Sequence, residues 1–309
     1  MSSLKGTLEL SATFALATPS YRGDLERCRL LCESIDRFVS GHAVHYLLVE
    51  DRDVPLFREL EGPRRRILPE SQLLPGWLRP QPDPLSFGKR RLWTGLRALG
   101  RGVPPLRGWH AQQLRKFAVA KAIAEDVIVF ADSDMLFVRP FDLASQEKDG
   151  AIRLYSKPGA ITADMLERHV PWCENAAALL GLGRPAFPCP DYINMVTWRR
   201  ALVLDLLDHV ERLSGRDWVS AIARRRRFSE YVIYGFYVER VLGLEAAGHR
   251  AEPEELCKYY WFSEDVAGFE RLQSFEEVLE PWQVAVAVQS FIDQPLERIR
   301  QLFERQAAI

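Results

Sequence analysis

Two short apolar runs near the start of the chain are separated by a segment with helical spacing. Residues 11–18 (SATFALAT) and 42–50 (HAVHYLLVE) are the apolar runs, and each predicts a strand. Between them a predicted N-cap, Asp24, precedes apolar residues with helical spacing: Leu25, Cys28, Leu31, Cys32, Ile35 and Phe38. Strand, helix and strand in this order predict a right-handed unit with parallel strands.

The same alternation continues downstream. Residues 110–124 predict an amphipathic helix, and residues 126–131 (DVIVFA) predict a strand that is covered on both faces. Further strands are predicted near 151–155, 192–198 and 284–288, and further helices near 163–181, 200–213, 229–242 and the C-terminus. The pattern favours a single α/β domain.

Residues 62–108 interrupt this pattern. They hold eight of the 19 prolines and seven of the 19 glycines, with ten Lys and Arg against two acidic residues. The chain has a formal net charge of −1, so this segment carries +8 and the remainder −9. We interpret the segment as a long irregular insertion, either a solvated basic loop or a lid over an anion, with Arg90 and Arg91 as candidate contacts.

The composition is that of an ordinary globular protein, 47% hydrophobic and 27% charged, and it gives no overall attraction to nucleic acid. Polar residues interrupt the N-terminal apolar run, which argues against a signal peptide, and no run is long enough for a membrane span. We therefore expect a cytoplasmic protein. The five dispersed cysteines are interpreted as buried free thiols.

The strongest chemical signal is Asp132-Ser133-Asp134, directly after the apolar strand at 126–131. Ligands of open α/β sheets bind at the carboxyl ends of the strands. Two carboxylates one residue apart at such an end suit a divalent cation with oxygen ligands, Mg²⁺ or Mn²⁺, that also contacts substrate phosphates. The alternative is a helix cap or a surface turn.

Several motifs together resemble the GT-A-type glycosyltransferases, in a poorly characterised bacterial branch. They are Trp109-His110-x-Gln112-Gln113-x-x-Lys116 with VIVFADSDMLFVRPF, Ala17-Thr18-Pro19-Ser20-Tyr21, Pro190-Asp191-Tyr192-Ile193-Asn194, and Phe228-Ser229-Glu230-Tyr231-x-x-Tyr234-Gly235. The resemblance covers most of residues 10–240. It implies a Rossmann-like, mainly parallel sheet flanked by helices, with a catalytic domain at 1–245 and a C-terminal extension at 246–309.

The resemblance also implies a metal-dependent transfer of sugar from a nucleotide-sugar, a UDP-sugar, to an unknown acceptor, anionic or carbohydrate. Asp132 and Asp134 would hold Mn²⁺ or Mg²⁺, with His249 as the third ligand; the alternatives are a surface histidine and a polar pair, Gln289-Ser290. The donor-binding residues implied in this way are Thr18, Pro19, Tyr21, Glu50, Asp51, Gln113, Lys116, Asp132 and Ser133.

Two carboxylates, Asp191 and Glu230, lie in otherwise apolar and aromatic segments, a setting that raises a carboxyl pKa and suits acid–base catalysis. Their alternatives are a turn residue for Asp191 and a first-turn helix residue behind an N-cap, Ser229, for Glu230. The run Arg224-Arg225-Arg226-Arg227 is either a solvated face or a contact for an anionic acceptor.

Two other functions remain open. A haloacid-dehalogenase-like phosphatase or phosphotransferase also places D-x-D after an apolar strand, but its nucleophile is usually near the N-terminus, and here Met135-Leu136-Phe137 follow the motif. A GT-A-shaped binding protein without turnover is the other alternative.

Overall fold

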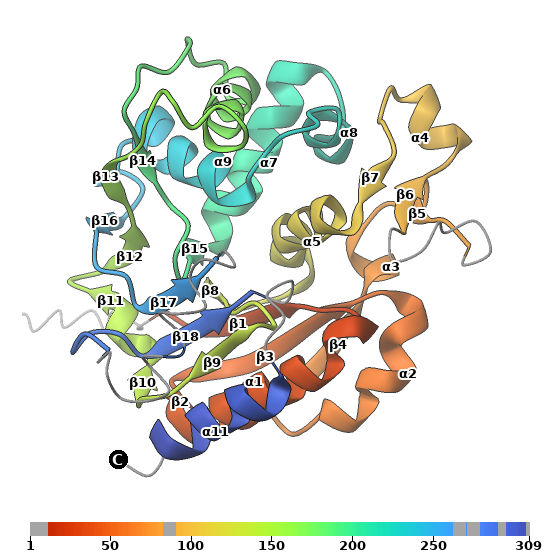
Figure 1. Cartoon of the computed structure of the whole chain (residues 1–309). Coiled ribbons are helices and arrows are strands. Elements are labelled where there is room, and N and C mark those ends of the chain that lie inside the picture. The colour runs from red at the N-terminus through yellow and green to blue at the C-terminus, as the bar shows by residue number, and fades with distance from the viewer. Residues whose placement is uncertain (1–11, 83–90, 262–269, 271–278, 290–294, 307–309) are drawn as a thin grey trace, which may run out of the picture.

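The chain folds around a five-stranded sheet with the order β15-β8-β1-β3-β4 (Figure 1). The strands β1 (Phe14–Pro19), β3 (His42–Val49), β4 (Arg65–Pro69) and β8 (Val127–Phe130) are parallel, and β15 (Thr197–Arg199) is antiparallel to β8. The mainly parallel α/β fold predicted from the sequence is confirmed. The computed structural model describes residues 12–82, 91–261, 270, 279–289 and 295–306.

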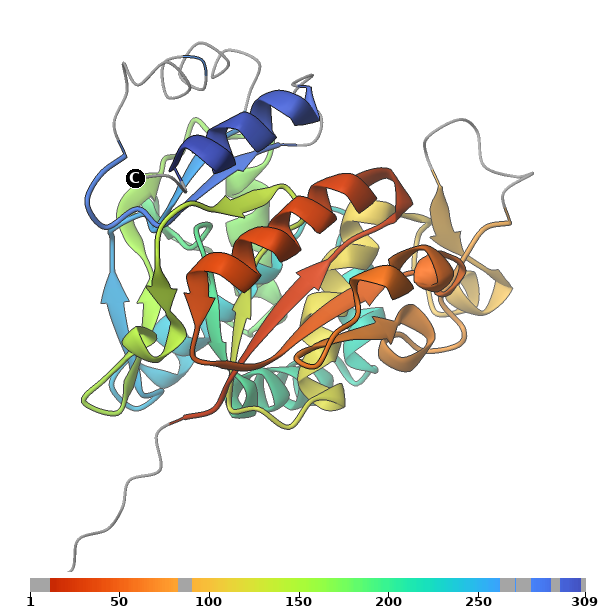
Figure 2. The same ribbon diagram turned by 90° about the horizontal axis from the view of Figure 1, so that it is seen from below.

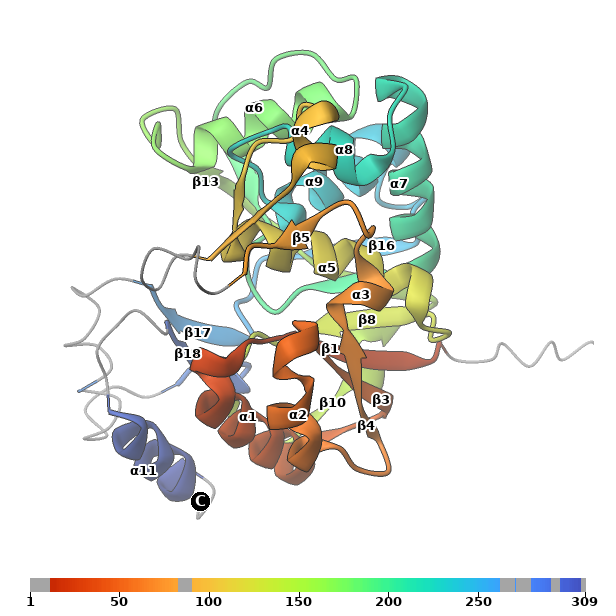
Figure 3. The same ribbon diagram turned by 90° about the vertical axis from the view of Figure 1, so that its right-hand side faces the viewer.

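Helices cover both faces of this sheet (Figure 3). On one face lie α1 (Leu25–Phe38) and α2 (Val54–Phe57), and α1 buries four of its six predicted apolar positions, Cys28, Leu31, Cys32 and Ile35. On the other face lie α5 (Gly108–Ala122), α6 (His169–Leu179), α7 (Arg200–Ser214), α8 (Trp218–Ala223) and α9 (Glu230–Phe236).

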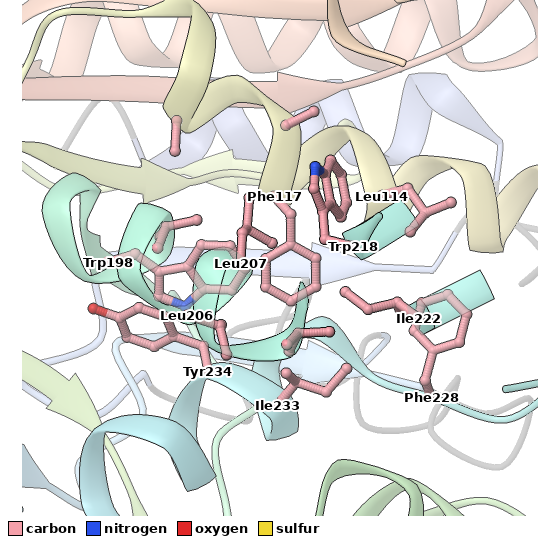
Figure 4. Packing of buried hydrophobic residues seen from close by; sticks show 14 of the residues in the cluster. Leu114, Phe117, Trp198, Leu206, Leu207, Trp218, Ile222, Phe228, Ile233 and Tyr234 are labelled. Atoms are coloured by element: carbon pink, nitrogen blue, oxygen red, sulfur yellow. The ribbon is translucent and has the colours of Figure 1, made fainter. Parts of the chain in front are cut away.

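The helices on the second face are held together by stacked aromatic rings (Figure 4). Trp198 stacks on Phe117 of α5, with ring centroids 5.2 Å apart, and on Tyr234 of α9 at 4.8 Å. All three side chains are fully buried. At Gly235 a Cβ atom would lie 2.4 Å from the Tyr192 ring, so α9 approaches this ring closely only because the residue is glycine. This packing fixes α9 against α5 and the sheet.

The interpretation of residues 62–108 as irregular is wrong for much of the segment. Its first part forms β4 of the central sheet, and Arg65 occupies this strand with its guanidinium turned inward. Arg65 Nε donates to His45 Nδ1 at 3.0 Å, and its Nη2 lies 2.6 Å from Asp36. The other elements are α3 (Glu70–Leu73), β5 (Arg79–Pro80), β6 (Leu92–Thr94), α4 (Leu96–Gly100) and β7 (Leu106–Arg107).

Three predicted elements differ in extent. The predicted strand at 192–198 is replaced by β14 (Cys189–Asp191), a turn and β15. The helix predicted at 163–181 begins only at His169. The helix predicted at 229–242 is α9, followed by a π-helical stretch over Tyr237–Leu242.

The C-terminal segment contributes strands and a helix to the same body. The strand β18 (Ala285–Val288) lies between β17 (Cys257–Tyr260) and β9 (Met135–Phe137). The helix α11 (Leu296–Gln306) lies along α1 (Figure 2), where Phe303 meets Phe38 edge to face. Smaller strands are β2 (Val39–Ser40), β10 (Phe141–Asp142), β11 (Glu147–Lys148), β12 (Ala151–Tyr155), β13 (Lys157–Ile161) and β16 (His249–Glu252).

All five cysteines are buried and free, as expected. Within the described part of the chain, none of the helices combines the length and apolar character needed to cross a bilayer.

Candidate functional site

The site lies where the carboxyl ends of β1 and β8 meet. These two strands are neighbours, and the next parallel strand in the chain after β1, β3, lies on the side away from β8. The connections leaving the two strand ends therefore diverge, and open α/β sheets bind ligands at such positions. Asp132, Ser133 and Asp134 form the turn from β8 to β9, closed by Met135 N donating to Asp132 O at 2.9 Å.

A buried lysine joins three elements at this position. Lys116 of α5 places Nζ 2.8 Å from Asp132 Oδ1 and 3.1 Å from Glu230 Oε1 at the start of α9. Nζ also donates to the Tyr231 hydroxyl, and its side chain is 4% exposed. Burial lowers the pKa of Lys116, but the two carboxylates outweigh burial and raise it. The lysine is therefore a fixed positive charge.

Asp134 lies on the other side of the same turn in a setting that disfavours its charge. Burial is the largest cause, and the nearby carboxylates of Asp132 and Asp24 add to it, so the pKa of Asp134 rises to about 7. Arg27 opposes the shift. The Oδ1 atom of Asp134 is buried and has no hydrogen-bond partner. A carboxylate oxygen in this state is poised for a cation.

Asp24 is a site residue that the sequence reasoning missed. It stands at the N-cap of α1, but its side chain makes no capping hydrogen bond, so that prediction is wrong. Instead, Asp24 Oδ2 accepts a hydrogen bond from Ser133 Oγ at 3.4 Å. Burial raises the pKa of Asp24, and the nearby charge of Arg27 only partly opposes this shift. The signal available in the sequence was its position just after β1, the strand beside β8.

We call these residues the acidic cluster: the carboxylates of Asp24, Asp132, Asp134 and Glu230 with the cations of Lys116 and Arg27. Four carboxylates thus face two cations. Among the described residues, no three or more His, Cys, Asp or Glu side chains are gathered closely enough to hold a metal ion. Asp132 and Asp134 are the two carboxylates of this cluster that share one turn, and an ion held by two carboxylates keeps water or phosphate oxygens as its other ligands.

A second group of charges lies at the carboxyl ends of β3 and β4, and we call it the ion-paired cluster. Glu50 Oε2 lies 3.0 Å from both Arg52 Nε and Arg91 Nη1. Asp53 pairs with Arg22 at 2.7 Å. In the same cluster Glu70 faces Arg115 at 3.7 Å and accepts from Trp93 Nε1 at 2.8 Å.

The predicted basic lid is only partly described by the structure. Arg91 lies in the ion-paired cluster, where its guanidinium meets Glu50, and Arg90 lies outside the described residues. Asp51 accepts hydrogen bonds from the backbone N and the hydroxyl of Ser71.

The turn after β1 divides into buried and exposed residues. Thr18 is fully buried, and Pro19 ends the strand among buried residues. Because Arg65 donates to Nδ1 of His45, Nε2 carries the proton and donates to Thr18 Oγ1 at 2.8 Å. Tyr21, by contrast, is 45% exposed. Of the predicted contacts with a base or ribose in this turn, Tyr21 is thus the side chain that reaches solvent.

The remaining predicted residues fall in three places. Gln113 is buried, and its Oε1 accepts from the backbone N of Glu230 at 3.1 Å, so it positions the start of α9. At that start Ser229 caps the helix through Val232 N, as expected. Asp191 is the last residue of β14. Burial raises its pKa, and the hydrogen bond that its Oδ1 accepts from Ile193 N opposes this shift.

The described contacts of His249 are with Tyr234 and Ile152, outside the acidic cluster. It is 4% exposed in β16, and its Nδ1 donates to Ile152 O at 3.0 Å. The Nε2 atom accepts from the Tyr234 hydroxyl at 2.8 Å, so both ring nitrogens have partners. Burial lowers its pKa to about 4. The alternative polar pair is described only at Gln289, whose backbone N donates to Tyr260 O at 3.3 Å; Ser290 lies outside the described residues.

The chain belongs to DUF6492, a family of unknown function, whose model matches residues 7–309. No curated protein matches it. It resembles two structures of the glycosyltransferase GlyE of Streptococcus pneumoniae TIGR4, at 12% identity and TM-score 0.42 for the apo form, and at 13% and 0.44 for the other. Each covers 96% of this chain, which spans 60% and 61% of the two GlyE chains.

A further similar structure is apo mouse xyloside xylosyltransferase 1, at 11% identity and TM-score 0.47. The similarity covers 92% of this chain and all of that one. Similarity of this extent leaves the function to be argued from the residues of the site.

Proposed function

We propose that this chain is a metal-dependent glycosyltransferase that moves a sugar from a nucleotide-sugar donor, a UDP-sugar, to an acceptor hydroxyl. The observation that carries the proposal is the buried Oδ1 of Asp134, which lacks a hydrogen-bond partner inside a cluster where carboxylates outnumber cations. A cation with phosphate oxygens among its ligands would bind the unpartnered oxygen and offset the excess negative charge.

In this proposal Asp134 and Asp132 hold Mn²⁺ or Mg²⁺. The bound ion would supply electrostatic stabilisation for the charge that develops on the departing diphosphate. Asp132 is suited to a shared role, since its side chain is 28% exposed while Oδ1 is held by Lys116. His249 has partners at both nitrogens, and we therefore leave it out of the proposed ligand set.

The chain's own residues would orient the donor around this point. Lys116 keeps a buried positive charge beside Asp132, and this charge also favours a diphosphate nearby. Ser133 has its hydroxyl within the turn, and Tyr21 offers an exposed ring for a base at the end of β1. Asp51 is exposed at the end of β3 and is proposed to contact the ribose or base.

The two candidate acid–base residues lie in different electrostatic surroundings. Burial raises the pKa of both carboxyls, but the pKa of Glu230 is also changed by Lys116 and Asp132, whereas that of Asp191 is changed by His169 and Glu255. We assign Glu230 to the leaving-group side, where it fixes Lys116, and Asp191 to the acceptor side, where a raised pKa suits a base for a hydroxyl. Asp191→Asn should then lower transfer while leaving donor binding intact.

The first test is binding. In a thermal-shift assay after chelation, UDP with Mn²⁺ should raise the melting temperature, because a ligand that binds only the folded state stabilises it by mass action. Asp134→Asn should lose the Mn²⁺-dependent part of the shift. The matched control is Asp126→Asn, at the opposite end of β8, where Asp126 Oδ2 accepts from Thr13 N at 2.9 Å. A preference for GDP, or no metal-linked shift, would contradict the UDP-sugar proposal.

The second test is turnover. UDP release from UDP-sugars with Mn²⁺ should fall by at least about 100-fold in Asp134→Asn, the scale of losing an electrostatic group at the reacting centre. Asp126→Asn should retain turnover. Unchanged metal-dependent release in Asp134→Asn would remove the basis of the assignment, and a covalent phosphate on Asp132 would point to a phosphatase instead.

A further inference from the structure

The tip of a projecting arm carries exposed leucines. The arm consists of β5, β6, β7 and α4, with α4 at its end, away from the central sheet (Figure 1). Leu96 is 90% exposed and Leu99 is 54% exposed. The two are three residues apart in one short helix, so they lie on the same side of it. Single exposed leucines are common on protein surfaces, but a pair at the end of an arm is a local feature.

Arginines lie on the same arm as these leucines and on a turn that contacts it. Arg97 and Arg101 are exposed on and directly after α4. Arg224 Nη1 donates to Arg101 O at 3.0 Å, and this contact joins the arm to the turn Arg224–Arg227 between α8 and α9. Arg101 also lies 3.8 Å from Asp217, a pair in which both side chains are more than 40% exposed. The exposed arginines of the arm and this turn are Arg97, Arg101, Arg224, Arg226 and Arg227.

An exposed tryptophan lies next to the residue that contacts the arginine turn. His110 Nε2 donates to Arg226 O at 3.0 Å, so the start of α5 adjoins the arginine turn. Next to it, Trp109 is 48% exposed and lies 5.9 Å from the Trp172 ring. We call the leucines, the arginines and Trp109 together the basic tip surface.

We propose that the basic tip surface docks the protein on an anionic lipid bilayer. Exposed apolar side chains can enter the boundary between headgroups and acyl chains, and a tryptophan is favoured at that depth. Guanidinium groups bind lipid phosphates with two hydrogen bonds, and the negative surface potential of the membrane attracts them.

The exposed leucines favour an anionic bilayer over other anionic partners. A polyanion without apolar groups would pair with the arginines but would leave Leu96 in water, so it would not explain the apolar part of the surface. The proposal goes beyond the proposed function, because it concerns where the protein works and is tested without donor, metal or turnover.

Vesicle flotation with the full chain tests the proposal. The protein should float with vesicles of phosphatidylcholine and phosphatidylglycerol but not with phosphatidylcholine alone, and salt should weaken the binding because it screens exposed charges. The double variant Leu96→Ser/Leu99→Ser should bind at least about tenfold more weakly. The triple variant Arg97→Glu/Arg226→Glu/Arg227→Glu should not bind.

Control variants change exposed residues of the same types elsewhere on the protein. Leu213 is 55% exposed on α7, so Leu213→Ser should bind like the unmodified chain. A triple reversal at Arg58, Arg66 and Arg184, all exposed, should also bind normally. Three results would overturn the proposal: no binding to the anionic vesicles, full binding by the leucine variant, or equal binding to soluble polyglutamate. Far-ultraviolet circular dichroism of each variant shows whether weaker binding results from the changed surface or from unfolding.

Discussion

The acidic cluster and the ion-paired cluster lie at the carboxyl ends of neighbouring parallel strands, yet they distribute charge in opposite ways. In the ion-paired cluster three buried carboxylates, Glu50, Asp53 and Glu70, face four arginines. In the acidic cluster four carboxylates face two cations, and Asp134 Oδ1 has neither a hydrogen bond nor an ion pair among the described residues. A cluster with balanced charges can have a purely structural role. A cluster with excess negative charge destabilises the folded state, and a bound cation would remove this destabilisation.

The largest expected effect is the loss of the buried lysine. Lys116→Met removes the cation that faces Asp132 and Glu230, and leaves the nearly buried Glu230 without its partner. We expect the free energy of unfolding to fall by about 3–5 kcal/mol in urea titrations. The double variant Lys116→Met/Glu230→Gln should recover part of this loss. A single variant as stable as the parent would mean that the lysine does not balance the cluster.

The next effect is a pH dependence of the acidic cluster with the metal chelated. The pKa of Asp134 is raised to about 7, so between about pH 4 and pH 7 the folded state keeps a proton that the unfolded state has lost. The free energy of unfolding should therefore decrease as the pH rises through this window. Three pKa units correspond to at most about 4 kcal/mol, and to about half of that for a partly exposed side chain.

Urea titrations at a series of pH values measure this slope. Asp134→Asn should flatten it, because the amide does not titrate. Asp126→Asn should keep it, since hydrogen bonds from Thr13 lower the pKa of Asp126 and place its transition at more acidic pH. An unchanged slope in Asp134→Asn would assign the pH dependence to other groups.

The sequence predicted the sheet well where the spacing of apolar residues was regular. The strands β1, β3 and β8 and the helix α1 were all visible as apolar runs or helical spacing. The strand β4 was missed because its first residues are arginines, and Arg65 satisfies its charge through His45 and Asp36, partners that no local pattern reveals. Local spacing reports burial, but it does not report pairing over long distances in the chain.

The site shows the same limit. Asp132, Ser133 and Asp134 were found because they directly follow a buried strand, and Lys116 was found through its place on the preceding helix. Asp24 was interpreted as a helix cap, since only the neighbouring arrangement of β1 and β8 brings it to Ser133. His249 carries the right chemistry for a ligand, but β16 places it against Tyr234 and Ile152.

The smallest expected effect concerns the ion-paired cluster. Arg91→Met removes one of two arginines from Glu50, while Arg52 stays 3.0 Å from the same oxygen. Because the carboxylate keeps a partner, we expect a loss of only about 1–3 kcal/mol in the free energy of unfolding. The Mn²⁺-dependent thermal shift should be unchanged, since Glu50 and Arg91 balance each other and add no net charge to the neighbouring cluster. If Arg91→Met altered the Mn²⁺ shift as strongly as Asp134→Asn, the two clusters would act as one electrostatic unit, and the contrast between a structural and a ligand-binding strand end would fail.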